Sequence, residues 1–309
     1  MSTYLQNLTT RLASGLARTP DEFRRRHCDF LLAAQNPDGG FSGREGGSDL
    51  YYTGFALRGL ACLGALANPT TRRAADFLRT RLQQSASVVD FMSLLYAARL
   101  IQASGGPDVL SEHSSDWPAR VAAALESFRK PDGGYSKATE GTAGSTYHTF
   151  LVALCYELIG LPLPDPSGVV KFVRSRYRDD GGYVEVAPAR RGGTNPTAAA
   201  VALLRMFGAI DNSTADGTIA FLACLQSADG GLRANTRAPL CDLLSTFTGL
   251  LTLQDLGATE YIDLVALGRF IESIELRLGG FRGGLWDNAG DVEYTFYGLG
   301  AVALVAPRQ

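Results

Sequence analysis

The organisation of this chain follows from one stretch, Phe30-Leu31-Leu32-Ala33-Ala34-Gln35-Asn36-Pro37-Asp38-Gly39-Gly40-Phe41. An apolar run is followed by the short polar segment 35–38, by two glycines and by an aromatic residue. A near copy occupies 221–232, and shortened copies stand at 131–135, 179–183 and 278–281. Because glycine adopts positive φ at little steric cost and commonly ends helices, each copy predicts the end of one helix and a connection to the next.

The spacing of these copies predicts a repeat architecture. Gly133, Gly181, Gly230 and Gly279 follow one another at intervals of about 48 residues, and Gly39 precedes Gly133 by about twice that interval. One copy has therefore lost its glycines, and we expect its position near 84–87. The chain then holds six repeats.

Each repeat combines an amphipathic helix with a more apolar one. The apolar partner over 51–66, for example, carries apolar or small residues on nearly all sides and must be buried. Six such pairs predict an all-α fold, an (α/α)6 barrel with the apolar helices inside, formed by 1–309 as a single domain. We place the repeats at approximately 23–66, 73–104, 118–160, 169–209, 217–257 and 264–306.

Composition narrows the class of protein. Apolar residues make up 46% of the chain, enough for a large core, and a net charge of −2 gives no electrostatic reason to expect a nucleic-acid partner. The five cysteines show no Cys-x-x-Cys spacing and are expected to be buried free thiols. Without a signal-peptide pattern or an apolar run long enough to span a bilayer, the sequence predicts a soluble cytoplasmic protein.

The repeat phrase resembles that of the prenyltransferase and squalene-cyclase repeat proteins, with 30–41 and 221–232 as the best matches. The size is most similar to the β subunit of protein farnesyl- and geranylgeranyltransferases. The resemblance implies an isoprenoid diphosphate in a central cavity, transfer of its prenyl group to an acceptor, and a helical-repeat α subunit as partner. Triterpene cyclases of this group carry an Asp-x-Asp-Asp motif, which this sequence lacks.

The same resemblance implies a zinc site at the start of the fifth and sixth inner helices. Aligning the glycine breaks places Asp242 on the family's first ligand, but a leucine stands where the cysteine should be. On the sixth helix, which opens at Asp291, Tyr294 stands in place of the histidine. Cys241 beside Asp242 and Glu293 beside Tyr294 are the available substitutes, so Asp242 and Cys241 are the candidate zinc ligands.

Four residues are the catalytic candidates. Asp242, Tyr294 and His148 are each able to serve as a base that activates an acceptor, and Asp291 opens the sixth inner helix. His148 belongs to a Tyr-His-Thr string that opens the third inner helix. A histidine bonded near a helix start is an equally good interpretation of its position.

The inner helix starts are expected to meet at one rim. Alignment of the repeats puts six good N-cap residues there: Asp49, Asp90, Ser145, Asn195, Asp242 and Asp291. Six positive helix ends around one mouth suit an anion. Arginines in the preceding loops are expected on the same rim, and Arg190, Arg191 and Arg237 are the candidate diphosphate contacts. The others are Arg44, Arg233 and Arg282.

Aromatic residues of the inner helices and loops are candidates for the cavity wall, although such stripes are also typical of plain core. We select Tyr52, Tyr147, Trp286 and Tyr297 as substrate-binding candidates. Three functions remain open: prenyl transfer, a single-domain terpene cyclase that protonates an alkene with a rim or cavity aspartate, and a non-catalytic isoprenoid-binding or scaffold toroid.

Overall fold

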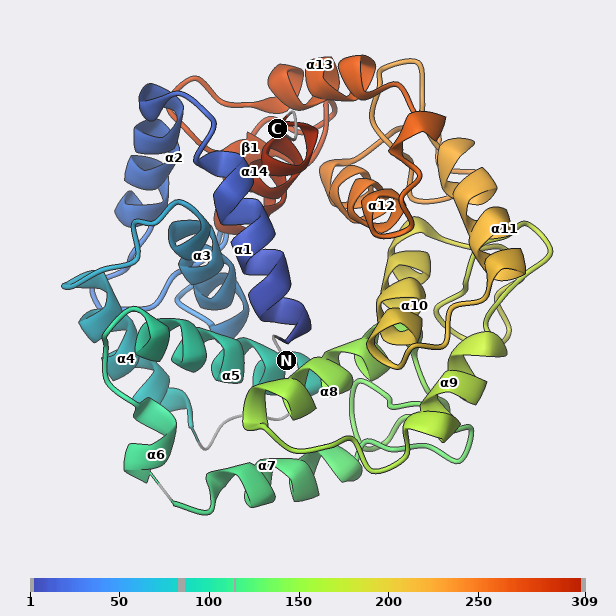
Figure 1. The fold of residues 1–309 in the computed structure, drawn as a ribbon. Coiled ribbons are helices and arrows are strands. Elements are labelled where there is room, and N and C mark those ends of the chain that lie inside the picture. The colour runs from blue at the N-terminus through green and yellow to red at the C-terminus, as the bar shows by residue number, and fades with distance from the viewer. Residues whose placement is uncertain (1–2, 83–86, 114, 307–309) are drawn as a thin grey trace.

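The computed structural model describes residues 3–82, 87–113 and 115–306, and in this part of the chain it is a closed ring of helix pairs (Figure 1). The predicted (α/α)6 toroid is confirmed. The inner helices are α3 (Leu50–Cys62), α5 (Val88–Ala103), α8 (Thr146–Ile159), α10 (Thr194–Met206), α12 (Leu243–Asp255) and α14 (Val292–Val305). The outer helices are α2 (Asp21–Ala33), α4 (Thr70–Arg81), α7 (Trp117–Glu126), α9 (Pro166–Arg174), α11 (Asn212–Ala223) and α13 (Leu264–Ile274).

The remaining elements are short or lie outside the alternation. They are α1 (Tyr4–Leu16), α6 (Val109–His113), a 3-10 turn at Thr259–Tyr261 and the two-residue strands β1 (Phe281–Arg282) and β2 (Gly290–Asp291), which pair antiparallel. No helix of the described residues is long and apolar enough to cross a membrane. All five cysteines are free thiols, but Cys224 is exposed and Cys28 half-buried, against the expectation that all are buried.

The glycine breaks are built alike in five repeats. The first glycine of each pair has positive φ, as at Gly181 (84°), where a Cβ would lie 2.1 Å from the carbonyl oxygen of Gly217 on the next outer helix. The amide of the aromatic or leucine residue that follows donates to a threonine hydroxyl of the next inner helix. In the fourth repeat, Tyr183 N donates to Thr197 Oγ1 at 2.9 Å. The equivalent threonines are Thr53, Thr149, Thr246 and Thr295.

The rim of inner helix starts differs from the prediction at two positions. Asp49, Ser145, Asp242 and Asp291 are N-caps as expected. Asp90 was expected to cap α5, which is wrong, because Ser87 is the cap and Asp90 completes a capping box with it. Asn195 is likewise one residue inside α10, whose cap is Gly193. Most of the expected glycine-free break at 84–87 lies outside the described residues.

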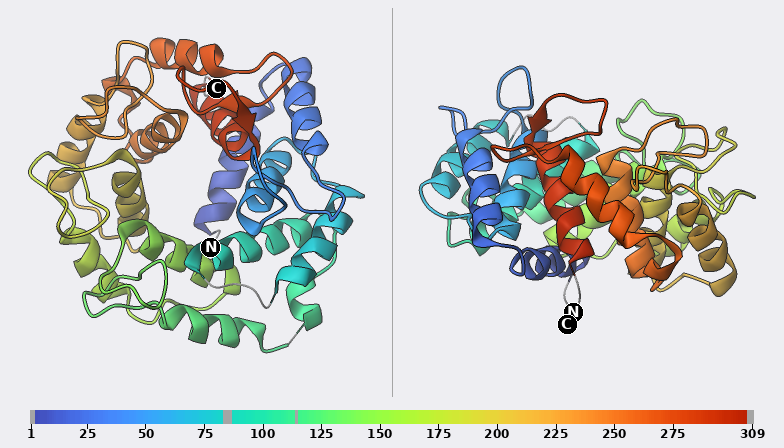
Figure 2. Two further views of the ribbon diagram at one scale, coloured as in Figure 1. Left: turned by 180° about the vertical axis from the view of Figure 1, so that it is seen from behind. Right: turned by 90° about the horizontal axis from the view of Figure 1, so that it is seen from above.

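Helix α1 was not predicted and lies across part of one end of the ring (Figure 1). It packs against α14 and α3 and lies across the side opposite the rim loops (Figure 2). Leu12 and Leu16 are buried there, and Gly15 lies so close to Ala303 of α14 that a Cβ would sit 2.3 Å from its carbonyl oxygen. Arg11 bonds Asp255 at 2.7 Å. Helix α1 therefore forms part of the floor on the side of the ring away from the rim loops.

Candidate functional site

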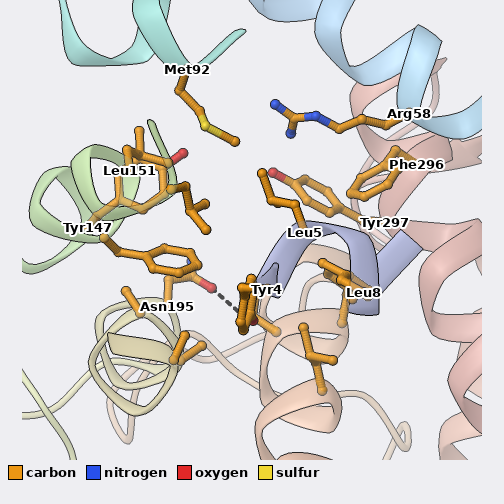
Figure 3. A pocket seen from close by; sticks show the side chains of 18 of the residues that line it. Tyr4, Leu5, Leu8, Arg58, Met92, Tyr147, Leu151, Asn195, Phe296 and Tyr297 are labelled. Atoms are coloured by element: carbon orange, nitrogen blue, oxygen red, sulfur yellow. Dashed lines mark hydrogen bonds between the residues drawn. The ribbon is translucent and has the colours of Figure 1, made fainter. Parts of the chain in front are cut away.

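The inner helices and α1 enclose a central cavity of about 420 Å³. Its wall is mainly apolar, with Leu5 and Leu8 of α1 facing Met92 and Leu151 across the space (Figure 3). Aromatic residues form much of the rest. They are Tyr4, Tyr51, Phe55, Tyr96, Tyr147, Phe150, Phe247, Phe296 and Tyr297. Several of these rings touch edge to face or at a tilt, such as Phe55 with Tyr297 at 5.2 Å between centroids.

Arg58 is the one cationic residue among the described residues that line this cavity. Its guanidinium carbon lies 4.8 Å from the ring centroids of Phe55 and Tyr96 and 6.0 Å from that of Phe296. Its buried Nε has no hydrogen-bond partner. A charged side chain thus stacks on the aromatic rings of a mainly apolar wall.

The carboxyl group of Glu293 lies behind two cavity-lining tyrosines, Tyr51 and Tyr297, at the rim end of the cavity. Glu293, in the first turn of α14, accepts a hydrogen bond at Oε1 from the Tyr51 hydroxyl (2.6 Å) and a longer one from Tyr297 (3.4 Å). Burial raises the pKa of Glu293 above its usual value, and the two tyrosine bonds act in the opposite direction. Burial also raises the pKa of Tyr51 and of Tyr297.

A second acidic group, Glu185, lines the cavity from the loop after α9. It bonds the Ser145 hydroxyl, and His148 Nδ1 is 2.6 Å from that hydroxyl and 4.0 Å from Glu185 Oε1. Burial raises the pKa of Glu185, and burial lowers the pKa of His148 to about 4. The shift of His148 favours its neutral form, and this residue is bonded near a helix start, as one of its two interpretations expected.

The family follows from a comparison with known proteins. The model of the prenyltransferase alpha-alpha toroid domain matches residues 5–94 and 95–308. The chain belongs to this family. A search of curated protein sequences gives no significant match.

Solved structures share the toroid fold at low sequence identity. Protein geranylgeranyltransferase-I of Candida albicans, complexed with GGPP, superimposes with a TM-score of 0.70 at 14% identity, covering 91% of this chain and 90% of that one. The type II terpene cyclase MstE from Scytonema gives 0.63 at 15% identity, with 96% and 98% covered. A protein from Actinoplanes gives 0.63 at 18%, with 93% and 99% covered.

Three of the catalytic candidates lie at the rim of this toroid without lining its cavity. Asp291 caps α14 and pairs with Arg44 (3.0 Å), which also holds Asp287 through two bonds. Tyr294 packs beneath the guanidinium of Arg44, at 5.6 Å from its ring centroid. Asp242 caps α12 and accepts from Ser245. Asp291, Tyr294 and Asp242 therefore cap helices, form an ion pair or pack against a side chain at the rim.

The candidate zinc ligands point to different surroundings. The Cys241 thiol lies against Gly231, where a Cβ would be 2.9 Å from Sγ, next to the Phe270 ring of the outer helix α13. Both carboxylate oxygens of Asp242 are used by Ser245. Within the ranges that the structure describes, no group of three His, Cys, Asp or Glu residues converges. The residues present thus do not form the three-ligand set that a catalytic zinc needs.

The substrate-binding candidates divide into two groups. Tyr147 and Tyr297 line the cavity of the toroid. Arg190, Arg191 and Arg237 are exposed on rim loops, Trp286 is 54% exposed, and Tyr52 packs against Gly43 beside the rim; none of these five lines the cavity.

The sequence interpretation missed Arg58 and Glu185 as site residues and did not assign Glu293 an acid role. A signal for Arg58 was present, because it is the only charged residue in the apolar run 50–62. Glu185 gave no comparable signal, since it stands in a loop.

Proposed function

We propose that this toroid binds an isoprenoid chain in its central cavity and starts its chemistry by protonating an alkene, in the manner of a terpene cyclase. The proposal rests most on Glu293, a half-buried carboxyl group that lies behind the cavity wall and accepts hydrogen bonds from two of the tyrosines that line it, Tyr51 and Tyr297. It favours the second of the three functions left open by the sequence.

The cavity suits the chain of such a ligand. Its volume falls within the roughly 300–1,000 Å³ range of small-molecule sites. Aliphatic and aromatic side chains supply a dry apolar surface, and the ring faces of Phe55, Phe247 and Phe296 are suited to stabilise a carbocation. The same features would support binding in a non-catalytic toroid. The argument for a reaction therefore rests on the acid Glu293.

Protonation is better supported than ionisation of a diphosphate. Burial shifts the pKa of Glu293 in the direction that an acid needs, and because Oε1 already accepts two hydrogen bonds, Oε2 is the oxygen suited to carry the proton. In the proposed step the O–H bond of Glu293 breaks, a C–H bond forms at the alkene, and the resulting cation closes rings before losing a proton to a base.

Prenyl transfer from an isoprenoid diphosphate is the second candidate. The rim of six inner helix starts and the exposed Arg190, Arg191 and Arg237 favour an anion there. The geranylgeranyltransferase-I relative was solved with GGPP, whereas the Scytonema cyclase was solved with geranylgeranyl dihydroxybenzoate as substrate. A helical-repeat α subunit and zinc stay predictions of the original resemblance.

One experiment separates the candidates. The protein is incubated in D2O with geranylgeraniol, geranylgeranoic acid or geranylgeranyl diphosphate, and products are analysed by mass spectrometry together with an assay for inorganic diphosphate. Protonation predicts a cyclic product with one new C–D bond and no diphosphate release. Diphosphate release without deuterium uptake would establish ionisation in its place.

Substitution of the acid supplies the matched control. Glu293→Gln is expected to lower turnover by roughly 10²- to 10⁴-fold while ligand binding persists. Glu126→Gln is the control, because Glu126 also accepts from two tyrosines, Tyr135 (2.8 Å) and Tyr156 (2.7 Å), but lies on the outer helix α7. Equal activity of wild type and Glu293→Gln would refute the assigned acid.

A further inference from the structure

We propose that Arg58 anchors a single carboxylate of the ligand inside the cavity, so that the substrate class is an isoprenoid acid; this rests on the proposed isoprenoid binding. Figure 3 shows the Arg58 side chain extending from α3 into the cavity toward Met92. It approaches from the wall opposite Tyr147 and Leu151.

Among the described residues, none forms a hydrogen bond or an ion pair with the Arg58 guanidinium. Across the described ranges, its contacts are the ring faces of Phe55, Tyr96 and Phe296. Stacking uses the face of the guanidinium and leaves its in-plane N–H donors without acceptors. A cation in an apolar wall is costly unless it is paired, so the missing acceptor is best supplied by the ligand.

A carboxylate matches this site in charge and shape. One guanidinium neutralises one carboxylate, and its planar N–H pair fits the two oxygens. A diphosphate carries more negative charge, and no second cation lines the described cavity wall. Glu185 on the wall and Glu293 behind Tyr51 would repel a multiply charged anion further when ionised.

The position of Arg58 also orients the ligand. Tyr51, at the start of α3, is bonded to Glu293, and Arg58 lies about two helical turns further along, roughly 10 Å toward the end of the ring where α1 lies. A carboxylate held at Arg58 directs the hydrocarbon chain toward the rim. The distal alkene then lies at the end of the cavity where the proposed acid stands.

Binding measurements on the full chain test this anchor. We expect wild type to bind geranylgeranoic acid more tightly than geranylgeraniol in calorimetric titrations. Arg58→Met should weaken binding of the acid by roughly tenfold to hundredfold and leave binding of the alcohol within about threefold. Arg58→Lys should retain part of the preference. Arg81→Met is the matched control, because Arg81 stacks on Phe77 outside the cavity.

Thermal denaturation distinguishes an anchor from a packing residue. Because Arg58 bonds no described protein group, ligand-free Arg58→Met should unfold at the same temperature as wild type or higher. A lower unfolding temperature together with weaker binding of both ligands would assign Arg58 to packing and overturn the anchor.

The remaining outcomes distinguish a failure of the proposed Arg58–carboxylate contact from a failure of the proposed isoprenoid-binding function. Equal affinity of wild type for acid and alcohol, tighter binding of the diphosphate, or unchanged acid binding by Arg58→Met would overturn the anchor alone. Failure of acid, alcohol and diphosphate to bind at all would overturn the proposed function as well.

Discussion

The hydroxyl of Tyr51 on α3 donates a 2.6 Å hydrogen bond to the carboxyl group of Glu293 on α14. The two helices lie at opposite ends of the sequence, and ring closure makes them neighbours in the inner wall. The bond fixes the orientation of a carboxyl group whose pKa is raised by burial. It links the first inner helix directly to the proposed chemistry.

This bond predicts the pH dependence of turnover. If Glu293 acts in its protonated form, kcat/KM falls as the pH rises through its raised pKa. The Tyr51 bond lowers that pKa, so Tyr51→Phe should move the falling limb to higher pH. A pH profile of product formation for both proteins checks this, with Tyr135→Phe on the outer shell as control. Superimposable profiles for Tyr51→Phe and wild type would remove Tyr51 from the mechanism.

His148 predicts a loss of stability in acid. Burial lowers its pKa from 6.5 to about 4, so between these values the unfolded chain binds a proton that the folded chain does not. The free energy of unfolding therefore decreases as the pH falls, by about 2 kcal/mol between pH 7.5 and 5. Urea titrations at both pH values should show that His148→Asn removes this difference. Glu185, with a raised pKa, contributes with the opposite sign and is present in both proteins.

The close approach of α1 and α14 predicts a severe effect of one methyl group. A Cβ at Gly15 would lie 2.3 Å from the Ala303 carbonyl oxygen, so Gly15→Ala must move α1 away from the ring. We expect a loss of about 2 to 4 kcal/mol in the free energy of unfolding. The neighbouring Ser14→Ala, at an exposed position, should change it by less than about 0.5 kcal/mol. Similar denaturation midpoints for the two variants would contradict the packing.

The threonine of the glycine break is a further stability determinant. Thr197→Val preserves the shape of the side chain but leaves the buried Tyr183 amide without its acceptor. The expected cost is about 1 to 3 kcal/mol, measured by chemical denaturation. Thr80→Val on the outer helix α4, whose hydroxyl donates to the Phe77 carbonyl of the preceding turn at 2.7 Å, serves as the control. A Thr197→Val protein as stable as wild type would show that the amide finds another partner.

The repeat period predicted the fold because the glycine break carries a strict local requirement. Gly181 needs positive φ and space for the neighbouring outer helix, and such a constraint is visible in residue type alone. The threonine that bonds the following amide was also visible, since it recurs 12 or 14 residues after the aromatic or leucine position. In the second repeat, Phe91 stands at the threonine position, four residues after the Ser87 cap. That repeat therefore has neither the glycine pair nor the threonine.

The cavity was less accessible to sequence reasoning. A register along the chain gives the height of a residue in the barrel, but whether its side chain points inward depends on the rotation of each helix. Tyr52 and Tyr51 are adjacent, yet only Tyr51 lines the cavity. Helix α1 has no glycine break, although the Thr3 and Gln6 capping box and the leucines at 5, 8, 12 and 16 indicated an amphipathic helix.

The contact of Gly15 with Ala303 has a consequence for how the molecule is made. During synthesis the amino-terminal helix leaves the ribosome first, yet the helix it packs against is the last inner helix of the chain. Until that segment emerges, the faces of α1 and α3 that pack against α14 stay uncovered and the wall of the cavity is incomplete. Nascent chains of this protein should therefore engage chaperones that bind apolar surfaces until α14 has been synthesised.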